Sequence, residues 1–121
     1  MKILVADDEP LIRRSLQKIF QRHGHVVILA EDGKQAVTLW QNERPDAVIL
    51  DVLMPGFTGP EVISEVGNSD RIPIILISAY TGDYNPEMAK SLGADLFIEK
   101  PFDSLSALVQ ALEDLMERKK P

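Results

Sequence analysis

Five short apolar runs recur along the chain, and their spacing constrains the fold more than any other feature of the sequence. They are KILVAD, HVVILA, DAVILD, IPIILIS and DLFIE, at residues 2–7, 25–30, 46–51, 72–78 and 95–99. These runs are mostly β-branched, and apolar and polar side chains do not alternate along them. Strands that are buried on both faces of a parallel sheet have this pattern. The sequence therefore predicts five parallel strands.

The segments between these runs have apolar residues at helical spacing. Helix starts are predicted at Pro10, at Asp32 with Gln35, at Thr58 with Glu61, at Asn85 with Pro86, and at Asp103. Helix stops are predicted at Gly24 and Gly93. The last helix has the most regular apolar face, and the first is expected to bury Leu11, Ile12, Leu16, Ile19 and Phe20.

Regular alternation of strands and helices implies a parallel sheet with helices on both faces. Right-handed crossovers leave few topologies, and the common doubly wound order for five strands is 2-1-3-4-5. We therefore expect an α/β fold, a flavodoxin-like doubly wound (βα)5 with a five-stranded parallel sheet. The 121 residues fit one domain, and we expect 118–121 to be a frayed tail or the start of a linker.

The charge of the chain argues against two classes of partner. Its formal net charge is −6 at pH 7. Nucleic-acid-binding domains and membrane-surface segments usually present clustered basic residues, so direct binding to nucleic acid or to a membrane is disfavoured. The sequence has no cysteine, which excludes disulfides and thiolate chemistry. We expect a cytoplasmic protein.

Polar residues stand where the predicted strands end. Asp7 and Asp8 follow the first strand, Asp51 ends the third, Ser78 ends the fourth, and Lys100 follows the fifth. Ligands of doubly wound sheets bind outside the carboxyl ends of the strands, at the switch point between the first and third strands. We therefore expect three carboxylates to face each other there, flanked by a hydroxyl and an ammonium.

Such a cluster has a chemical use. Two carboxylates about 4 Å apart repel by roughly 4 kcal/mol at an effective dielectric near 20, so a cation should offset the repulsion. Oxygen-only ligands suit Mg²⁺, which keeps waters or phosphate oxygens in its remaining positions. With Lys100 and Ser78, the set resembles a clamp for a phosphoryl group. An ionised aspartate needs no general base, so one carboxylate can itself be the nucleophile.

Each residue taken alone has a simpler interpretation. Asp7 or Asp8 can cap the first helix, and Asp51 can cap a turn. Ser78 alone is a strand-end hydroxyl bonded to the backbone, and Lys100 alone is a solvated lysine. Complementary groups at four strand ends are not expected by chance, so the set as a whole favours a phosphate or metal site.

With these residues in place, the chain resembles the receiver domain of bacterial two-component response regulators. The resemblance covers essentially the whole chain. It rests on LVADDEP, PDAVILDVLMPGFTG, PIILISA, GAD and EKPF, at residues 4–10, 45–59, 73–79, 93–95 and 99–102. The order, spacing and strand context of these motifs all agree, which makes the signal specific.

The resemblance implies a role for each site residue. Asp51 resembles the phosphoacceptor, which takes a phosphoryl group from the phosphohistidine of a kinase. Asp8 resembles the direct Mg²⁺ ligand, and Asp7 the acidic neighbour that usually acts through water. The main-chain carbonyl of Leu53 holds the place of a third protein ligand, and Lys100 that of the lysine that contacts the phosphoryl oxygens. The domain itself is then not an enzyme, although Mg²⁺-dependent self-phosphorylation and autodephosphorylation are expected.

The resemblance also implies a switch. Ser78 holds the Ser/Thr position that moves toward the phosphoryl group, and Phe97 holds the aromatic switch position. Phe97 is equally well explained as a core aromatic on a half-buried edge strand, and the two interpretations are compatible. The Lys100–Pro101 bond is cis in the family, which is energetically accessible for X-Pro.

Two further positions tune the lifetime of the phosphorylated state in this family. They lie two residues after Asp51 and two after Ser78, and here they are Leu53 and Tyr80. Both side chains are bulky and can obstruct an attacking water, so we expect slow autodephosphorylation.

The implied partners follow from this role. A sensor histidine kinase or a histidine phosphotransfer protein would supply the phosphoryl group. The face formed by residues 86–116 would then change shape or dynamics and control a downstream output domain or effector protein. Receivers often dimerise through this face, so a phosphorylation-dependent homodimer is a further candidate.

Other functions fit the sequence less well. A phosphohydrolase of the haloacid-dehalogenase type needs a second aspartate two residues after the first, which neither Asp51 nor Asp7 has. A flavodoxin-like cofactor binder needs a phosphate-cradling loop after the first strand, where this chain has acids. The dinucleotide and P-loop motifs are absent. A degenerate receiver that acts only as a phosphorylation-independent interaction module stays open.

Overall fold

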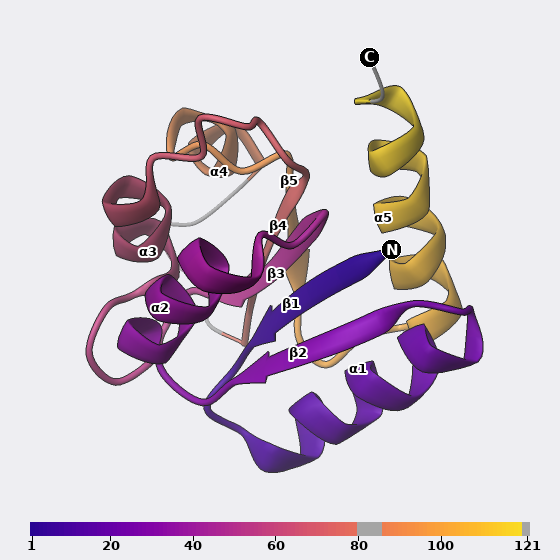
Figure 1. Cartoon of the computed structure of the whole chain (residues 1–121). Helices are drawn as coiled ribbons and strands as arrows, with labels where there is room; N and C mark the ends of the chain where they lie inside the picture. Colours follow the sequence, from indigo (N-terminus) through magenta and orange to yellow (C-terminus); the bar gives the residue numbers. More distant parts are fainter. Residues whose placement is uncertain (80–85, 120–121) are drawn as a thin grey trace.

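The computed structural model describes residues 1–79 and 86–119 (Figure 1). Its strands are β1 Lys2–Ala6, β2 Val26–Ala30, β3 Ala47–Asp51, β4 Ile74–Ser78 and β5 Leu96–Glu99. Its helices are α1 Pro10–Arg22, α2 Gly33–Glu43, α3 Gly59–Val66, α4 Pro86–Ser91 and α5 Leu105–Arg118. Every predicted strand and helix is present, with strand ends shifted by two residues at most. No helix in these ranges has the length and apolar character needed to cross a membrane.

The strands form one parallel sheet in the order β2-β1-β3-β4-β5, which confirms the predicted doubly wound topology. β3 and β4 are buried along their whole length, and β1 is buried from Ile3 onward. β2 and β5 lie at the two edges and are only partly buried. The expectation of burial on both faces is therefore correct for the central strands and wrong for the edges.

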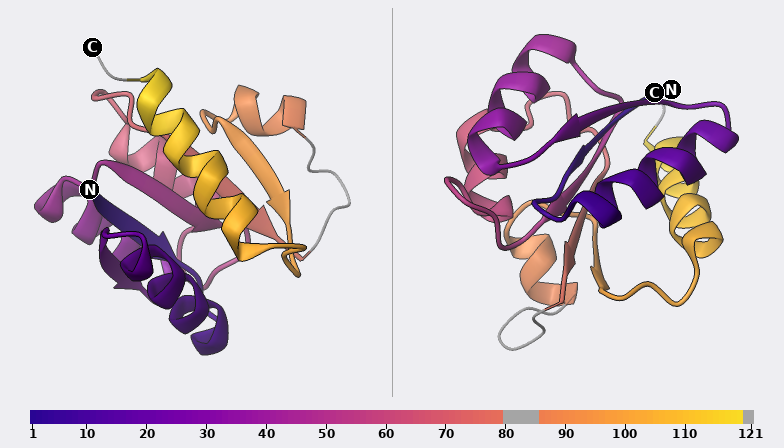
Figure 2. Two further views of the ribbon diagram at one scale, coloured as in Figure 1. Left: turned by 90° about the vertical axis from the view of Figure 1, so that its right-hand side faces the viewer. Right: turned by 90° about the horizontal axis from the view of Figure 1, so that it is seen from below.

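Helices cover both faces of the sheet (Figures 1 and 2). α1 and α5 lie on one face, and α2, α3 and α4 lie on the other. Alternate strand residues point to the two faces, so the molecule has two separate apolar cores. The core under α1 and α5 contains Ile3, Val5, Ile49, Ile75, Ile77, Leu16, Phe20, Leu108 and Leu112. The core under the other helices contains Leu4, Val48, Leu50, Leu76, Ala36, Trp40, Val62, Ile63 and Ala89.

The helix starts follow the capping signals with two differences. Thr58 and Glu61 form the predicted reciprocal capping box of α3. Asp32 caps α2 by accepting the Gln35 N–H at 2.8 Å, but the Gln35 side chain accepts from Glu31 N–H instead of completing the box. α4 begins at Pro86 as predicted, and its expected cap Asn85 lies outside the described residues.

The second difference is at α5, where Ser104 and not Asp103 is the N-cap. The Ser104 hydroxyl accepts the Ala107 N–H at 3.1 Å. The regular apolar face predicted for α5 is confirmed, because Leu108, Val109, Leu112, Leu115 and Met116 are buried and Leu105 is partly buried. In α1, by contrast, Leu11 does not join the predicted buried face, because it lies in the first turn, and 74% of it is exposed.

A close backbone approach links α3 to the end of β3. Gly59 begins α3, and its N–H donates to the Val52 carbonyl at 2.9 Å. A Cβ atom on this residue would lie 2.6 Å from the Asp51 carbonyl oxygen, so a glycine is needed there. This contact fixes the loop that follows Asp51 against the sheet.

The cap of α5 gives a direct test of these assignments. Ser104→Ala removes the side-chain acceptor of the Ala107 N–H, and we expect the free energy of unfolding to fall by about 1 kcal/mol. Asp103→Ala is the matched control and should change it by a few tenths of a kcal/mol at most, as is usual for surface substitutions. Denaturant unfolding of both variants is the measurement. A larger loss in Asp103→Ala than in Ser104→Ala would show that the cap is assigned to the wrong residue.

Candidate phosphoryl and metal site

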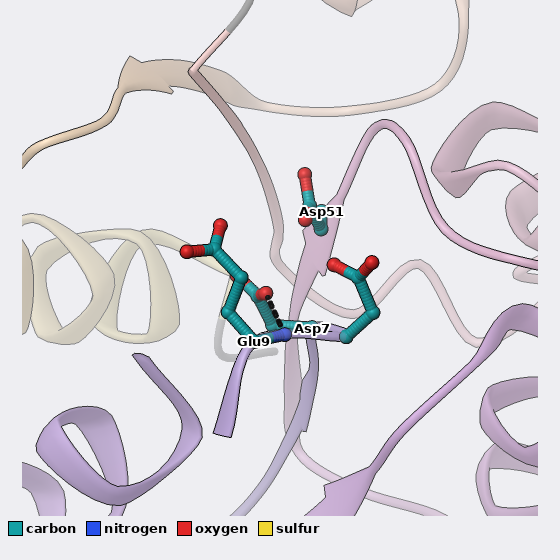
Figure 3. Close-up of side chains that lie close together, drawn as sticks. Asp7, Glu9 and Asp51 are labelled. Carbon is teal, nitrogen blue, oxygen red and sulfur yellow. Dashed lines mark hydrogen bonds between the residues drawn. The ribbon is translucent and has the colours of Figure 1, made fainter. Parts of the chain in front are cut away.

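The predicted site residues meet at the carboxyl end of the sheet. Because β1 and β3 are neighbours in the sheet, Asp7 and Asp8 at the end of β1 lie beside Asp51 at the end of β3. Figure 3 shows the side chains of Asp7, Glu9 and Asp51 gathered at this edge. A cavity of about 360 Å³ opens here, lined by Asp8, Glu9, Asp51, Leu53, Ser78, Ala79 and Lys100.

The Lys100 ammonium lies at the centre of this acidic cluster. Its Nζ donates to Glu9 Oε1 at 2.8 Å, to Asp7 Oδ2 at 3.0 Å and to Asp51 Oδ2 at 3.1 Å. Lys100, Asp7 and Asp51 are all buried. Buried charges are tolerated when they are paired and hydrogen-bonded, and this arrangement meets both conditions.

Burial and charge shift the pKa values of two of these groups. Burial, and next the negative charge of Asp7, raise the pKa of Asp51 from 3.8 to about 6, although Lys100 opposes the shift. Burial alone would lower the pKa of Lys100. Its hydrogen bonds to Glu9 and Asp7 and the negative charges of Asp51 and Asp7 outweigh this effect and hold the Lys100 pKa above its usual range. At pH 7 Asp51 is therefore mostly ionised and faces a fixed positive charge.

The turn between β1 and α1 holds the acidic residues in place. Asp7 Oδ1 accepts the Glu9 N–H at 2.8 Å, the bond drawn in Figure 3. Arg13 Nη1 donates to the Asp7 main-chain carbonyl at 2.7 Å, and its Nη2 lies 3.7 Å from Glu31 Oε1. Asp7 therefore receives support on both its side chain and its backbone.

Sequence reasoning did not assign Glu9 or Arg13 to the site. Glu9 carries a signal, because it continues the run of acids after Asp8. Arg13 carries none, since an arginine one turn into a helix is ordinary. Only the fold shows that its side chain returns to the carbonyl of Asp7.

The donor set fits a hard divalent cation. Asp7, Asp8, Glu9 and Asp51 each offer a carboxylate oxygen, and these atoms lie within 4.8 Å of one another. Carboxylate oxygens without nitrogen or sulfur ligands suit Mg²⁺. Asp8 is exposed and open to an ion, whereas Asp7 is buried against Lys100.

The two residues predicted to act as a switch, Ser78 and Phe97, lie on the neighbouring strands β4 and β5. Ser78 is buried at the end of β4, and its carbonyl accepts the Lys100 N–H at 2.8 Å. Phe97 lies in β5, partly buried against the core under α2, α3 and α4. The Lys100–Pro101 peptide bond is cis, as the resemblance implied. Leu53 lines the cavity with 52% of its surface exposed, and Tyr80 lies outside the described residues.

The raised pKa of Asp51 predicts a pH-dependent effect on stability in a chelator-treated protein. As the pH rises from about 4 to 6, Asp51 loses its proton at a lower pH in the unfolded chain than in the folded protein. The free energy of unfolding therefore falls as the pH rises through this range. Asp51→Asn should therefore be more stable than the unsubstituted protein by up to about 3 kcal/mol at pH 7, and by much less at pH 4. Urea unfolding at both pH values measures this, with the exposed Asp70→Asn as control. An equal difference at the two pH values would contradict the assignment.

Comparison with known proteins agrees with this architecture. The sequence matches the family described as the response regulator receiver domain over residues 3–113. Response regulator MprA of Mycobacterium tuberculosis is 36% identical over 122 residues, covering 100% of this chain and 53% of that relative. MprA of Mycobacterium sp. strain KMS is 37% identical with the same coverage. The chain thus spans about half the length of the curated relatives it matches.

Solved structures give the same result. The receiver domain of Francisella response regulator 1452 superimposes with a TM-score of 0.89 at 29% identity, covering 98% of each chain. Response regulator TrrA from Thermotoga maritima, solved in complex with Mg²⁺-BeF, has a TM-score of 0.82 at 35% identity and covers 94% of this chain and 97% of its own. Sequence and fold together establish that the chain belongs to the receiver domains of two-component response regulators.

Proposed function

We propose that Asp51 is the phosphoacceptor of this receiver domain. The observation that carries the proposal is the position of its carboxylate, which is buried at the cavity wall and bonded to the Lys100 ammonium at 3.1 Å. The carboxylate is mostly ionised at pH 7 and needs no general base to act as a nucleophile. The phosphoryl donor would be the phosphohistidine of a sensor histidine kinase or of a histidine phosphotransfer protein.

The transfer exchanges one bond for another. A carboxylate oxygen of Asp51 forms a bond to phosphorus while the P–N bond of the phosphohistidine breaks, and the electron pair of that bond stays on the imidazole nitrogen. The Lys100 ammonium lies where negative charge gathers on the phosphoryl oxygens, so it stabilises that charge without a proton transfer. Hydrolysis of the resulting acyl phosphate returns Asp51 to its starting state.

Mg²⁺ is the cation we propose for the site. Asp8, Asp51 and the main-chain carbonyl of Leu53 would hold it, with Asp7 acting through water. When bound, the ion would neutralise charge on the oxygens of the transferring group.

We infer that Ser78 and Phe97 pass the phosphorylation state to the face formed by α4, β5 and α5. A phosphoryl group on Asp51 carries roughly −1.5 to −2 charges in place of the single negative charge of the carboxylate, and it brings strong acceptor oxygens that attract the Ser78 hydroxyl. In the described part of α4, Ala89 is buried while Glu87, Met88, Lys90 and Ser91 are exposed, so little packing opposes a shift of this helix. An output domain, an effector protein or a second phosphorylated copy would recognise the changed face, and we place these events in the cytoplasm.

Intact-mass spectrometry after incubation with Mg²⁺ and acetyl phosphate or phosphoramidate tests this function. We expect one added phosphoryl group in the unsubstituted protein and in Asp70→Asn, an exposed control. Asp51→Asn, or a chelator, should abolish the addition because it removes the nucleophile or the cation.

Three other outcomes would contradict parts of the proposal. Uptake that persists in Asp51→Asn would mean that another residue is the phosphoacceptor. Uptake that is unaffected by the chelator would exclude the metal requirement. A folded protein that takes up nothing from small donors or from a phosphorylated histidine kinase would favour the degenerate receiver.

The lifetime of the phosphorylated state tests the role of Leu53. Its exposed side chain lines the cavity and obstructs an attacking water, so Leu53→Asn should speed autodephosphorylation by about two- to tenfold, equivalent to about 0.4–1.4 kcal/mol. Decay of the phosphorylated mass after donor removal is the measurement. Leu11→Asn is the matched control, because Leu11 is exposed and does not line the cavity. An unchanged decay rate in Leu53→Asn would rule out this role.

A further inference from the structure

The side chain of Glu9 has a position that its place in the fold does not require. Glu9 is the N-cap residue of α1, but its carboxylate makes no capping hydrogen bond to that helix. Instead it reaches back to Lys100, which follows β5, and forms the shortest of the three bonds to Nζ, at 2.8 Å. The backbone of Glu9 is fixed by its N–H bond to Asp7, so the side chain starts from a defined point (Figure 3).

The Lys100 ammonium has no hydrogen left for another acceptor. An ammonium group has three N–H donors, and here they point to three carboxylates, those of Asp7, Glu9 and Asp51. Oxygens of a phosphoryl group can therefore reach Nζ only by displacing carboxylates that are already bonded to it.

Asp51 would carry the phosphoryl group, so the carboxylates that can be displaced are those of Asp7 and Glu9, and they differ in how easily they leave. Asp7 is fully buried, so its carboxylate would lose its charged partner in a place that water does not reach. Glu9 is 57% exposed, and water can hydrate its carboxylate as soon as it leaves Lys100. Glu9 is therefore the partner that the ammonium gives up at the lowest free-energy cost.

Charge repulsion gives the displacement its direction. An oxygen of Glu9 lies within 4.8 Å of an oxygen of Asp51. A phosphoryl group on Asp51 carries roughly −1.5 to −2 charges, which replace the single charge of the carboxylate, and brings new oxygens into that space beside the negative charge of Glu9. Glu9 has solvent to move into, whereas the phosphoryl group is tied to Asp51.

We propose that Glu9 is a positioning residue that holds the Lys100 ammonium in the unphosphorylated protein and is exchanged for the phosphoryl group during transfer. This inference rests on the proposed function of Asp51. In this role Glu9, the last of the three consecutive acids at residues 7–9, competes with the phosphoryl group for the Lys100 ammonium.

Two substitutions separate the effect of the negative charge of Glu9 from the effect of its side-chain length. Glu9→Gln keeps the length of the side chain and removes the charge. Glu9→Asp keeps the charge but shortens the side chain by one methylene, which withdraws the carboxylate from Nζ. An aspartate is favourable at a helix N-cap, so the second variant should fold. Glu65→Gln on α3 is the control for net charge, because Glu65 is exposed and does not line the cavity.

The rate of phosphoryl uptake from phosphoramidate is the first readout. Phosphoramidate transfers its phosphoryl group to Asp51 as its P–N bond breaks, and ammonia leaves. We expect Glu9→Gln and Glu9→Asp both to react about two- to fivefold faster than the unsubstituted protein, the range expected for loss of a partly exposed ion pair. Glu65→Gln should react at the original rate. If only Glu9→Gln reacts faster, Glu9 acts by repelling the donor with its negative charge and not by holding Lys100. If neither variant reacts faster, Glu9 does not compete with the phosphoryl group for Lys100.

The ¹⁵Nζ signal of Lys100 is the second readout, and it does not depend on phosphorylation. Lys100→Met identifies the signal by its loss. In the unphosphorylated protein both Glu9 variants should shift it and speed the exchange of its protons with water, whereas Glu65→Gln should not. An unshifted signal would show that Glu9 does not hold Lys100. If the unsubstituted protein takes up no phosphoryl group, the proposed role of Asp51 is wrong, and so is the exchange of Glu9 for a phosphoryl group. The ¹⁵Nζ spectrum would still decide whether Glu9 holds Lys100.

Discussion

The carboxyl edge of the sheet depends on one cation, the Lys100 ammonium. Asp7 and Asp51 are buried beside each other, and their repulsion would be unfavourable without a positive charge between them. The strand order places β4 and β3 between the end of β5 and the end of β1. A long, unbranched side chain is therefore needed to carry a charge from β5 to both acids, and lysine provides it. The hydrogen bond from the Lys100 backbone N–H to the Ser78 carbonyl fixes the backbone position from which this side chain extends.

The same interaction sets two opposing conditions for Asp51. Burial makes the negative charge of Asp51 unfavourable and raises the pKa of its carboxyl group. Lys100 limits that penalty enough for the carboxylate to stay mostly ionised near pH 7. Arg13 and the Glu9 N–H hold Asp7, and Glu31 lies 3.7 Å from the Arg13 guanidinium and offsets its charge, so the pocket keeps its negative character. The acidic cluster thus has the ligand chemistry of a divalent-cation site and contains one buried ammonium, that of Lys100.

Much of this arrangement could be predicted from the sequence, because it follows from periodicity and strand order. Apolar runs that end in Asp7, Asp51 and Ser78 place those residues at one edge once the order 2-1-3-4-5 is known. Finer features could not be predicted. Asp103 and Ser104 are both good cap residues, and only the backbone conformation selects Ser104. The contacts of Glu9 with Lys100 join residues 91 positions apart, and no local pattern records them.

The separation of the two apolar cores has a consequence for how the domain can evolve and move. Because strand side chains alternate between the faces, α1 and α5 share none of their core residues with α2, α3 and α4. The face under α1 and α5 buries large side chains such as Leu16, Phe20 and Leu112, whereas the described side chains of α4 contribute only the methyl group of Ala89 to the opposite core. A displacement of α4 therefore leaves half of the hydrophobic interior untouched. The packing of α1 and α5 on the sheet can therefore hold the fold while the opposite surface around α4 varies.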